Sequence, residues 1–158
     1  MSKSAKIFCT LLLTFFSSGK LFAQSGEPPR KEIRRNNINT YAGMVEYNIN
    51  YERNLLYSAI TSTNIRVGGG IAAFLTAGTG TYLNIAAVQL LGKSSSHLEL
   101  DLGLKYLITN SIVNPGLSES LVPDLFAGYR FEKPTGRLIL RLGMNYPTLF
   151  NAGFGYKF

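Results

Sequence analysis

The sequence predicts an all-β fold, an antiparallel up-and-down transmembrane β-barrel with eight strands as the preferred number. Three observations predict it. Apolar and polar residues alternate along several runs. These runs are about ten residues long, the length of a strand that crosses a bilayer rather than of an ordinary strand. Their polar faces carry charges of both signs. A soluble β-sandwich stays open as an alternative, because alternation alone does not say which face is buried.

The composition excludes other classes. The chain has 158 residues, of which 46% are apolar and 16% are charged, and it is rich in Gly (16), Tyr (9) and Phe (10). This bias favours strands and turns. After the N-terminal segment, no run approaches the ~18 apolar residues of a membrane helix. A helical membrane bundle and a disordered chain are therefore not expected.

The N-terminus has the pattern of a secretory signal peptide over residues 1–23. Lys3 and Lys6 precede an apolar stretch, and a small residue, Ala23, stands at a suitable cleavage point. The single cysteine, Cys9, lies inside this segment, so the mature chain has neither a disulfide nor a thiolate site. We expect a polar tail over residues 24–33 and one barrel domain over residues 34–158.

Removal of the signal also weakens the basic character of the chain. Cleavage removes Lys3, Lys6 and Lys20. The formal net charge falls from +7 to +4, because the mature chain has 13 basic and 9 acidic residues. Nucleic-acid binding is not expected.

The alternation is clearest in residues 97–106. Leu98, Leu100 and Leu102 lie on one face, while Glu99 and Asp101 lie on the other. The remaining regular runs are residues 45–52, 64–74, 81–92, 122–131, 136–146 and 149–158. Single-chain bacterial barrels have an even number of strands, so an eighth strand is expected in residues 34–42, the least regular run.

The polar faces hold five acidic and five basic residues. Inside a small barrel these charges must pair, because an isolated buried charge costs several kcal/mol or more. The expected lumen network is Glu46, Glu52, Arg66, Glu99, Asp101, Lys105, Asp124, Arg130, Arg137 and Arg141.

The segments between the runs suggest up-and-down hairpins. Residues 92–96 and 132–136 read as short turns, and a longer polar loop begins at Thr109 and ends at Ser120. With the C-terminus in the periplasm, the short turns lie on that side, whereas residues 76–80 and 109–120 face outward. A ligand or protein partner is expected at the loop of residues 109–120. Gly68 and its two glycine neighbours are expected within a strand, where they either ease its curvature or make room for a large neighbouring side chain.

The C-terminal strand alternates aromatic residues and ends on Phe158. It resembles the terminal strand that the outer-membrane barrel assembly machinery recognises, with Phe154, Tyr156 and Phe158 as the assembly signal. Over residues 38–158 the chain resembles small outer-membrane β-barrel proteins of Bacteroidetes-type bacteria. Three segments carry this resemblance, namely Asn50-Tyr51-Glu52-Arg53, Leu98-Glu99-Leu100-Asp101-Leu102-Gly103 and Gly128-Tyr129-Arg130-Phe131. The resemblance implies the outer membrane of a Gram-negative bacterium, with outer-membrane lipid and the assembly machinery as partners.

The resemblance supplies no catalytic residues, and the residues predict none. We expect no enzyme, no cofactor and no metal site, and a structural or surface-interaction role for a barrel with a filled lumen. A narrow channel for small solutes stays open as an alternative. A lipid A-modifying enzyme is a further one, with residues 94–96, His97 and Glu99 as the local set. Ser96 and His97 are adjacent on a strand, however, and so point to opposite faces.

Overall fold

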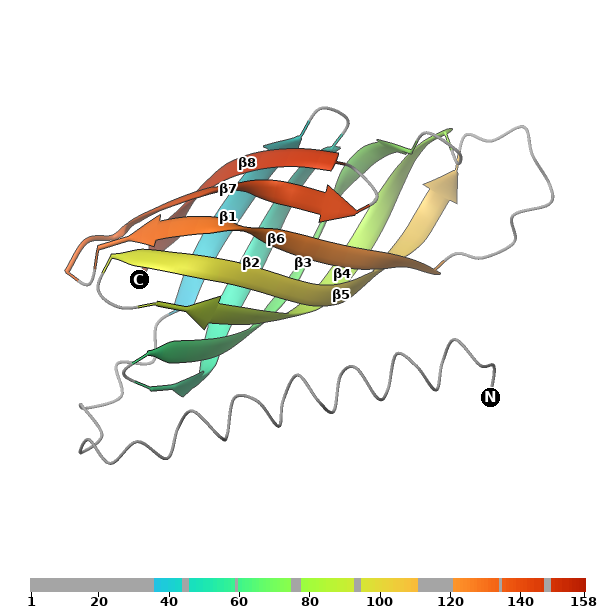
Figure 1. Cartoon of the computed structure of the whole chain (residues 1–158). Coiled ribbons are helices and arrows are strands. Elements are labelled where there is room, and N and C mark those ends of the chain that lie inside the picture. Colours follow the sequence, from blue (N-terminus) through green and yellow to red (C-terminus); the bar gives the residue numbers. More distant parts are fainter. Residues whose placement is uncertain are drawn as a thin grey trace, which may run out of the picture.

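The computed structural model is a closed barrel of eight strands (Figure 1). It describes residues 36–43, 46–58, 60–74, 78–92, 95–110, 121–133, 135–146 and 149–158. The strands are β1 (Asn36–Gly43), β2 (Glu46–Tyr57), β3 (Thr61–Phe74), β4 (Gly78–Leu91), β5 (Ser96–Asn110), β6 (Leu121–Glu132), β7 (Leu138–Tyr146) and β8 (Leu149–Lys157). The predicted signal peptide and polar tail lie outside the described residues.

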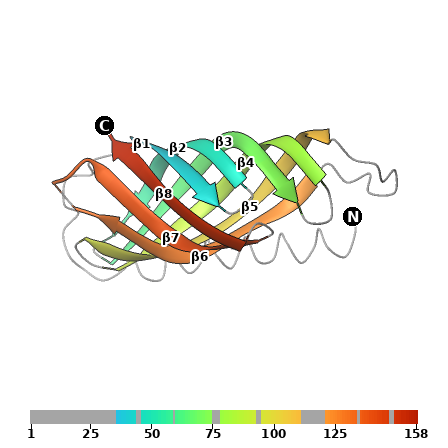
Figure 2. The same ribbon diagram turned by 90° about the horizontal axis from the view of Figure 1, so that it is seen from above.

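Every strand pairs antiparallel with its neighbour in the sequence, and β1 closes the sheet against β8. In this last pairing Ile38 is opposite Tyr156 and Ala42 is opposite Ala152. Figures 1 and 2 show the strands inclined to the long axis of the barrel. The predicted fold class is confirmed, and so is the eighth strand, which closes the barrel as β1.

Strands β2 to β6 are longer than the alternation predicts, because hairpin pairing continues beyond the regular runs, whereas β1, β7 and β8 are slightly shorter than the predicted runs. β2 continues to Tyr57, which pairs with Ser62 after a register shift between Asn54 and Leu56. β4 begins within the predicted loop of residues 76–80, where Gly80 pairs with Ala72 on β3. The prediction that residues 76–80 are all loop is therefore wrong. β5 likewise includes the first two residues of the predicted loop 109–120, and residues 111–120 lie outside the described residues.

The chain order gives the barrel two distinct ends. The end where β1 begins and β8 finishes, here called the terminal end, also carries the β2–β3, β4–β5 and β6–β7 connections. The opposite end, here called the loop end, carries the β5–β6 connection, which is the longest one. This arrangement places both predicted short turns at one end and the predicted long loop at the other.

The burial pattern is inverted relative to a soluble domain. In β2 it alternates residue by residue, with Glu46, Asn48 and Glu52 buried while Tyr47 and Ile49 are exposed. Across the described residues, 21 polar or charged residues are buried against nine apolar ones. Soluble domains bury mainly apolar residues, so this polar interior excludes the β-sandwich alternative. None of the described residues forms a helix long and apolar enough to span a membrane.

Glycines on the inner face make room for large side chains. A Cβ added at Gly153 would overlap the ring of Tyr41, and one added at Gly68 would overlap the amide of Asn50. Gly68 and Gly153 thus make room for neighbouring side chains, which is one of the two roles expected for the glycines that begin at Gly68.

Candidate functional site, the charge-paired lumen

The centre of the lumen holds a compact ion-pair cluster. Arg66 Nη2 lies 2.6 Å from both Glu52 Oε2 and Glu99 Oε1, and Arg66 Nη1 pairs with Asp101. Arg141 Nη2 lies 2.5 Å from Glu99 Oε1 and 3.0 Å from Asp101 Oδ2. All five side chains are buried. Two guanidinium groups therefore hold three carboxylates from β2 and β5.

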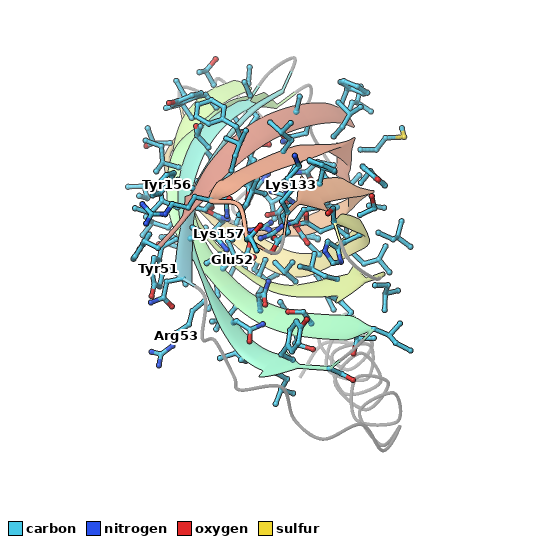
Figure 3. The ribbon with its side chains drawn as sticks, turned by 90° about the vertical axis from the view of Figure 1, so that its left-hand side faces the viewer. Tyr51, Glu52, Arg53, Lys133, Tyr156 and Lys157 are labelled. Atoms are coloured by element: carbon cyan, nitrogen blue, oxygen red, sulfur yellow. The ribbon has the colours of Figure 1, made fainter. Side chains whose placement is uncertain are left out.

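Arg130 extends this cluster toward the terminal end. Its Nη1 lies 2.7 Å from Glu52 Oε1, and its Nε lies 2.7 Å from Glu132 Oε2. Lys157 Nζ then lies 3.4 Å from Glu132 Oε1 and donates to the backbone oxygen of Lys133 at 2.8 Å. Figure 3 shows Glu52 and Lys157 inside the barrel, seen from this end. Charges are thus paired from the centre of the lumen to its terminal mouth.

A second cluster lies nearer the loop end. Lys105 Nζ lies 2.9 Å from Glu46 Oε2 and 3.1 Å from Asp124 Oδ1. Glu46 also accepts hydrogen bonds from the Tyr82 hydroxyl and, at 2.8 Å, from the Asn48 amide. The single ammonium group of this cluster is therefore shared by two carboxylates.

Aromatic rings and apolar side chains fill the space beside the ions. Arg141 Cζ lies 3.9 Å from the ring centre of Tyr41 and 4.4 Å from that of Phe126, a cation–π geometry. Toward the loop end, Tyr82 packs with Ala72 and Leu107. The lumen is a packed core made mostly of polar residues.

Asparagine side chains complete the shell around Glu52. Asn64 Nδ2 donates to Glu52 Oε1 at 2.7 Å, and Asn37 and Asn39 approach the same carboxylate at 3.4 Å. Neutral donors of this kind stabilise a buried carboxylate without adding charge. The asparagines of β1, which make its alternation of apolar and polar residues irregular, therefore have a role in the lumen as donors to Glu52.

A small cavity is lined by residues of both clusters, with Asp101 and Arg141 from the first and Asp124 from the second. It has room for about one water molecule. Five oxygens on its lining have no hydrogen-bond partner among the described residues, namely Tyr41 Oη, Asn84 Oδ1, Asp101 Oδ1, Asn145 Oδ1 and Asp124 Oδ1, the last of which is ion-paired with Lys105. The cavity therefore has the polarity and the size that suit a single water molecule.

Nine of the ten predicted lumen charges lie in the lumen, and Arg137 does not. Arg137 is exposed and donates from Nη1 to the hydroxyl of Tyr156 at 2.8 Å, a contact that raises its pKa. It precedes the start of β7 at Leu138, so the alternation of that strand does not orient it. Glu132 and Lys157 were missed, although the inward parity of β6 and β8 could have identified both.

The structure describes part of the set considered for lipid A chemistry. Ser96 is exposed, whereas Glu99 is buried and paired with two arginines. Residue 94 lies outside the described residues. Across the strands that the structure describes, no three His, Cys, Asp or Glu side chains are grouped to hold a metal ion.

Comparison with known proteins shows similarity at the level of the fold. No family model matches the chain, and no curated protein matches it by sequence. The chain is similar to the Yersinia pestis outer membrane protein Ail, whose backbone structure was determined in a phospholipid bilayer nanodisc, with 15% identity and a TM-score of 0.51. The match covers 78% of this chain and 97% of Ail, so the two share a small β-barrel fold.

Proposed function

We propose that this chain is an integral outer-membrane β-barrel of a Gram-negative bacterium, with a structural or surface-interaction role. The observation that carries the proposal is the sorting of its side chains. Leucine, isoleucine, tyrosine and phenylalanine cover the outside, while the lumen holds the paired charges. Exposed apolar surface on this scale requires a nonpolar environment, and a bilayer supplies it on all sides of a barrel. The similar fold of Ail, an outer membrane protein whose structure was determined in a phospholipid bilayer, supports this placement.

The filled lumen favours a structural role over a channel. An ion that crossed the centre would have to separate pairs such as Arg66–Glu52 and Arg141–Glu99, both almost completely buried. Breaking a buried pair costs about 3 to 5 kcal/mol. An eight-stranded barrel leaves an interior just wide enough for its own side chains. We therefore propose that the barrel does not conduct and is not an enzyme.

The proposed partners follow from the surfaces of the barrel. Outer-membrane lipid would contact the apolar exterior. The assembly machinery would recognise Phe154, Tyr156 and Phe158, which are all exposed on or next to β8. A ligand or protein partner would bind at residues 109–120, which join the loop-end termini of β5 and β6.

Cell fractionation with mass spectrometry tests the location. The expected result is a chain in the outer-membrane fraction that begins at Gln24, after cleavage behind Ala23. An uncut chain, or a chain soluble in the periplasm, would contradict the proposal.

A narrow channel is the second candidate, because the water-sized cavity is lined by residues of both charge clusters. Single-channel recording of the reconstituted barrel in a planar bilayer separates the two functions. The filled barrel is expected to show no conductance, and a steady conductance would establish the channel instead.

A further inference from the structure

Among the residues that the structure describes, the charged side chains outside the lumen are all of one sign. All six described acids face the lumen, namely Glu46, Glu52, Glu99, Asp101, Asp124 and Glu132. Three described bases, Arg53, Lys133 and Arg137, are instead exposed. Lys133 and Arg137 lie in the β6–β7 connection, and Arg53 lies in the part of β2 nearer to the terminal end. The exposed charged side chains there are all basic, and no Asp or Glu side chain of the described strands lies beside them.

Two of these bases lie beside tyrosines. Tyr51 on β2 and Tyr156 on β8 are both opposite Ile38 of β1, so they flank that strand on the outer face. Arg53 shares the face of Tyr51, two residues further along β2. Figure 3 shows Tyr51, Arg53 and Tyr156 on the same outer side of the barrel. Arg137, which donates to the Tyr156 hydroxyl, completes a group of four that we call the arginine–tyrosine patch.

The spacing of the patch suits one lipid headgroup. Neighbouring strands lie about 4.8 Å apart, so Arg53 on β2 and Arg137 beside β7 stand roughly 14 Å apart across β1 and β8. Two long side chains can approach a headgroup from both sides over this distance. A guanidinium group donates two parallel hydrogen bonds to a phosphate, and tyrosine is enriched where the hydrocarbon meets the headgroups. The hydrogen bond to the Tyr156 hydroxyl holds the guanidinium of Arg137 at the depth where the hydrocarbon meets the headgroups.

We propose that the arginine–tyrosine patch binds the phosphate of an anionic glycerophospholipid in the leaflet at the terminal end. The inference rests on the proposed membrane placement. No Asp or Glu side chain of the described residues lies in the patch to bind the cationic part of a zwitterionic headgroup, so its two guanidinium groups favour a lipid with net negative charge. The terminal end, where β1 begins and β8 finishes, faces the periplasm in the proposed orientation, and there the leaflet consists of glycerophospholipid.

Spin-labelled lipids test this selection. The full chain is reconstituted in phosphatidylcholine vesicles that contain a trace of spin-labelled phosphatidylglycerol or phosphatidylcholine, and the motionally restricted fraction is measured. We expect the wild type to favour phosphatidylglycerol, and we expect each of Arg53→Gln and Arg137→Gln to lower this preference by up to about fivefold. Tyr156→Phe should lower it less, because it removes only the hydroxyl that positions Arg137. Lys133→Gln is the matched control, since it removes one exposed charge at the same end outside the patch.

The results of this experiment distinguish a wrong lipid site from a wrong ligand and from a wrong membrane placement. An unchanged preference in both arginine variants, or an equal loss with Lys133→Gln, would overturn the patch as a site. Displacement of the labelled lipid by inorganic phosphate would show a site for free anions instead, and a stronger preference for spin-labelled lipid A would assign the patch to the other leaflet's lipid. Insertion is scored separately by heat-dependent migration in electrophoresis. A wild-type chain that does not insert would refute the membrane placement, whereas one that inserts without preference refutes only the lipid site.

Discussion

Replacing Glu52 with glutamine removes the carboxylate on which two arginines converge. Arg66 donates to it from Nε at 3.0 Å and from Nη2 at 2.6 Å, and Arg130 donates from Nη1 at 2.7 Å. Glutamine keeps the shape and loses the charge. The central cluster together with Arg130 has three arginines and three acids, and without the Glu52 charge it carries one uncompensated positive charge in a site closed to solvent.

The expected cost is about 3 to 5 kcal/mol, the range for breaking a buried ion pair by removal of one partner. Adding Arg130→Gln restores the balance, because Glu99 and Asp101 then face Arg66 and Arg141. The double variant should therefore be more stable than the sum of the single effects predicts, by about 2 to 3 kcal/mol.

The assay is urea unfolding of the barrel in lipid or detergent. Tyrosine fluorescence reports it, since the chain has nine Tyr and no Trp. Lys133→Gln removes an exposed charge and should leave the unfolding curve unchanged. A buried ion-pair cluster of this kind is refuted if the free energy of unfolding of Glu52→Gln is within about 1 kcal/mol of the wild-type value. It is also refuted if the effects of the two substitutions on that free energy are simply additive.

Three further predictions concern other parts of the barrel. Gly153→Ala drives a Cβ into the ring of Tyr41 and should cost about 1 to 3 kcal/mol in the same assay, whereas Ala152→Ser on the outer face should cost little; equal effects would contradict the packing. Leu100→Arg should cost about 2 to 4 kcal/mol near the midplane of a bilayer, and a lipid-soluble maleimide should label cysteines placed at Leu98, Leu100 and Leu102 but miss those at Glu99 and Asp101. Loss of this alternation would mean that the faces of β5 are misassigned. Deletion of Phe158 should lower the amount inserted in cells while detergent refolding stays nearly intact, because one aromatic adds only about 1.5 to 3 kcal/mol of burial; equal insertion in cells would refute a role in assembly.

The alternation of the strands was predictable because the direction of a side chain in a strand is a local property with a period of two residues. The alternation assigned Leu98 and Glu99 to opposite faces, and nine of the ten charged residues that it assigned to the lumen are buried there. It was wrong where a strand ends. Arg137 lies one residue before β7, where the period no longer applies, and Glu132 lies one residue past the predicted run 122–131. Lys157 lies inside the predicted run 149–158 with inward parity, but it was not included among the lumen charges.

The ion-pair partners could not be predicted in this way. Glu52 binds Arg130, which is 78 residues away on the far side of the sheet, and Arg66 of β3 reaches Glu99 and Asp101 of β5. These contacts cross the lumen, so they depend on which strands close the barrel and in which register. The role of the β1 asparagines could not be predicted either, because two of them lie beside Glu52 only when β1 and β2 pair in the closed barrel. The sequence by itself therefore determined which side chains face inward, because that depends on neighbours in the chain, while only the closed tertiary structure decided which charges meet, because that depends on strands far apart in the chain.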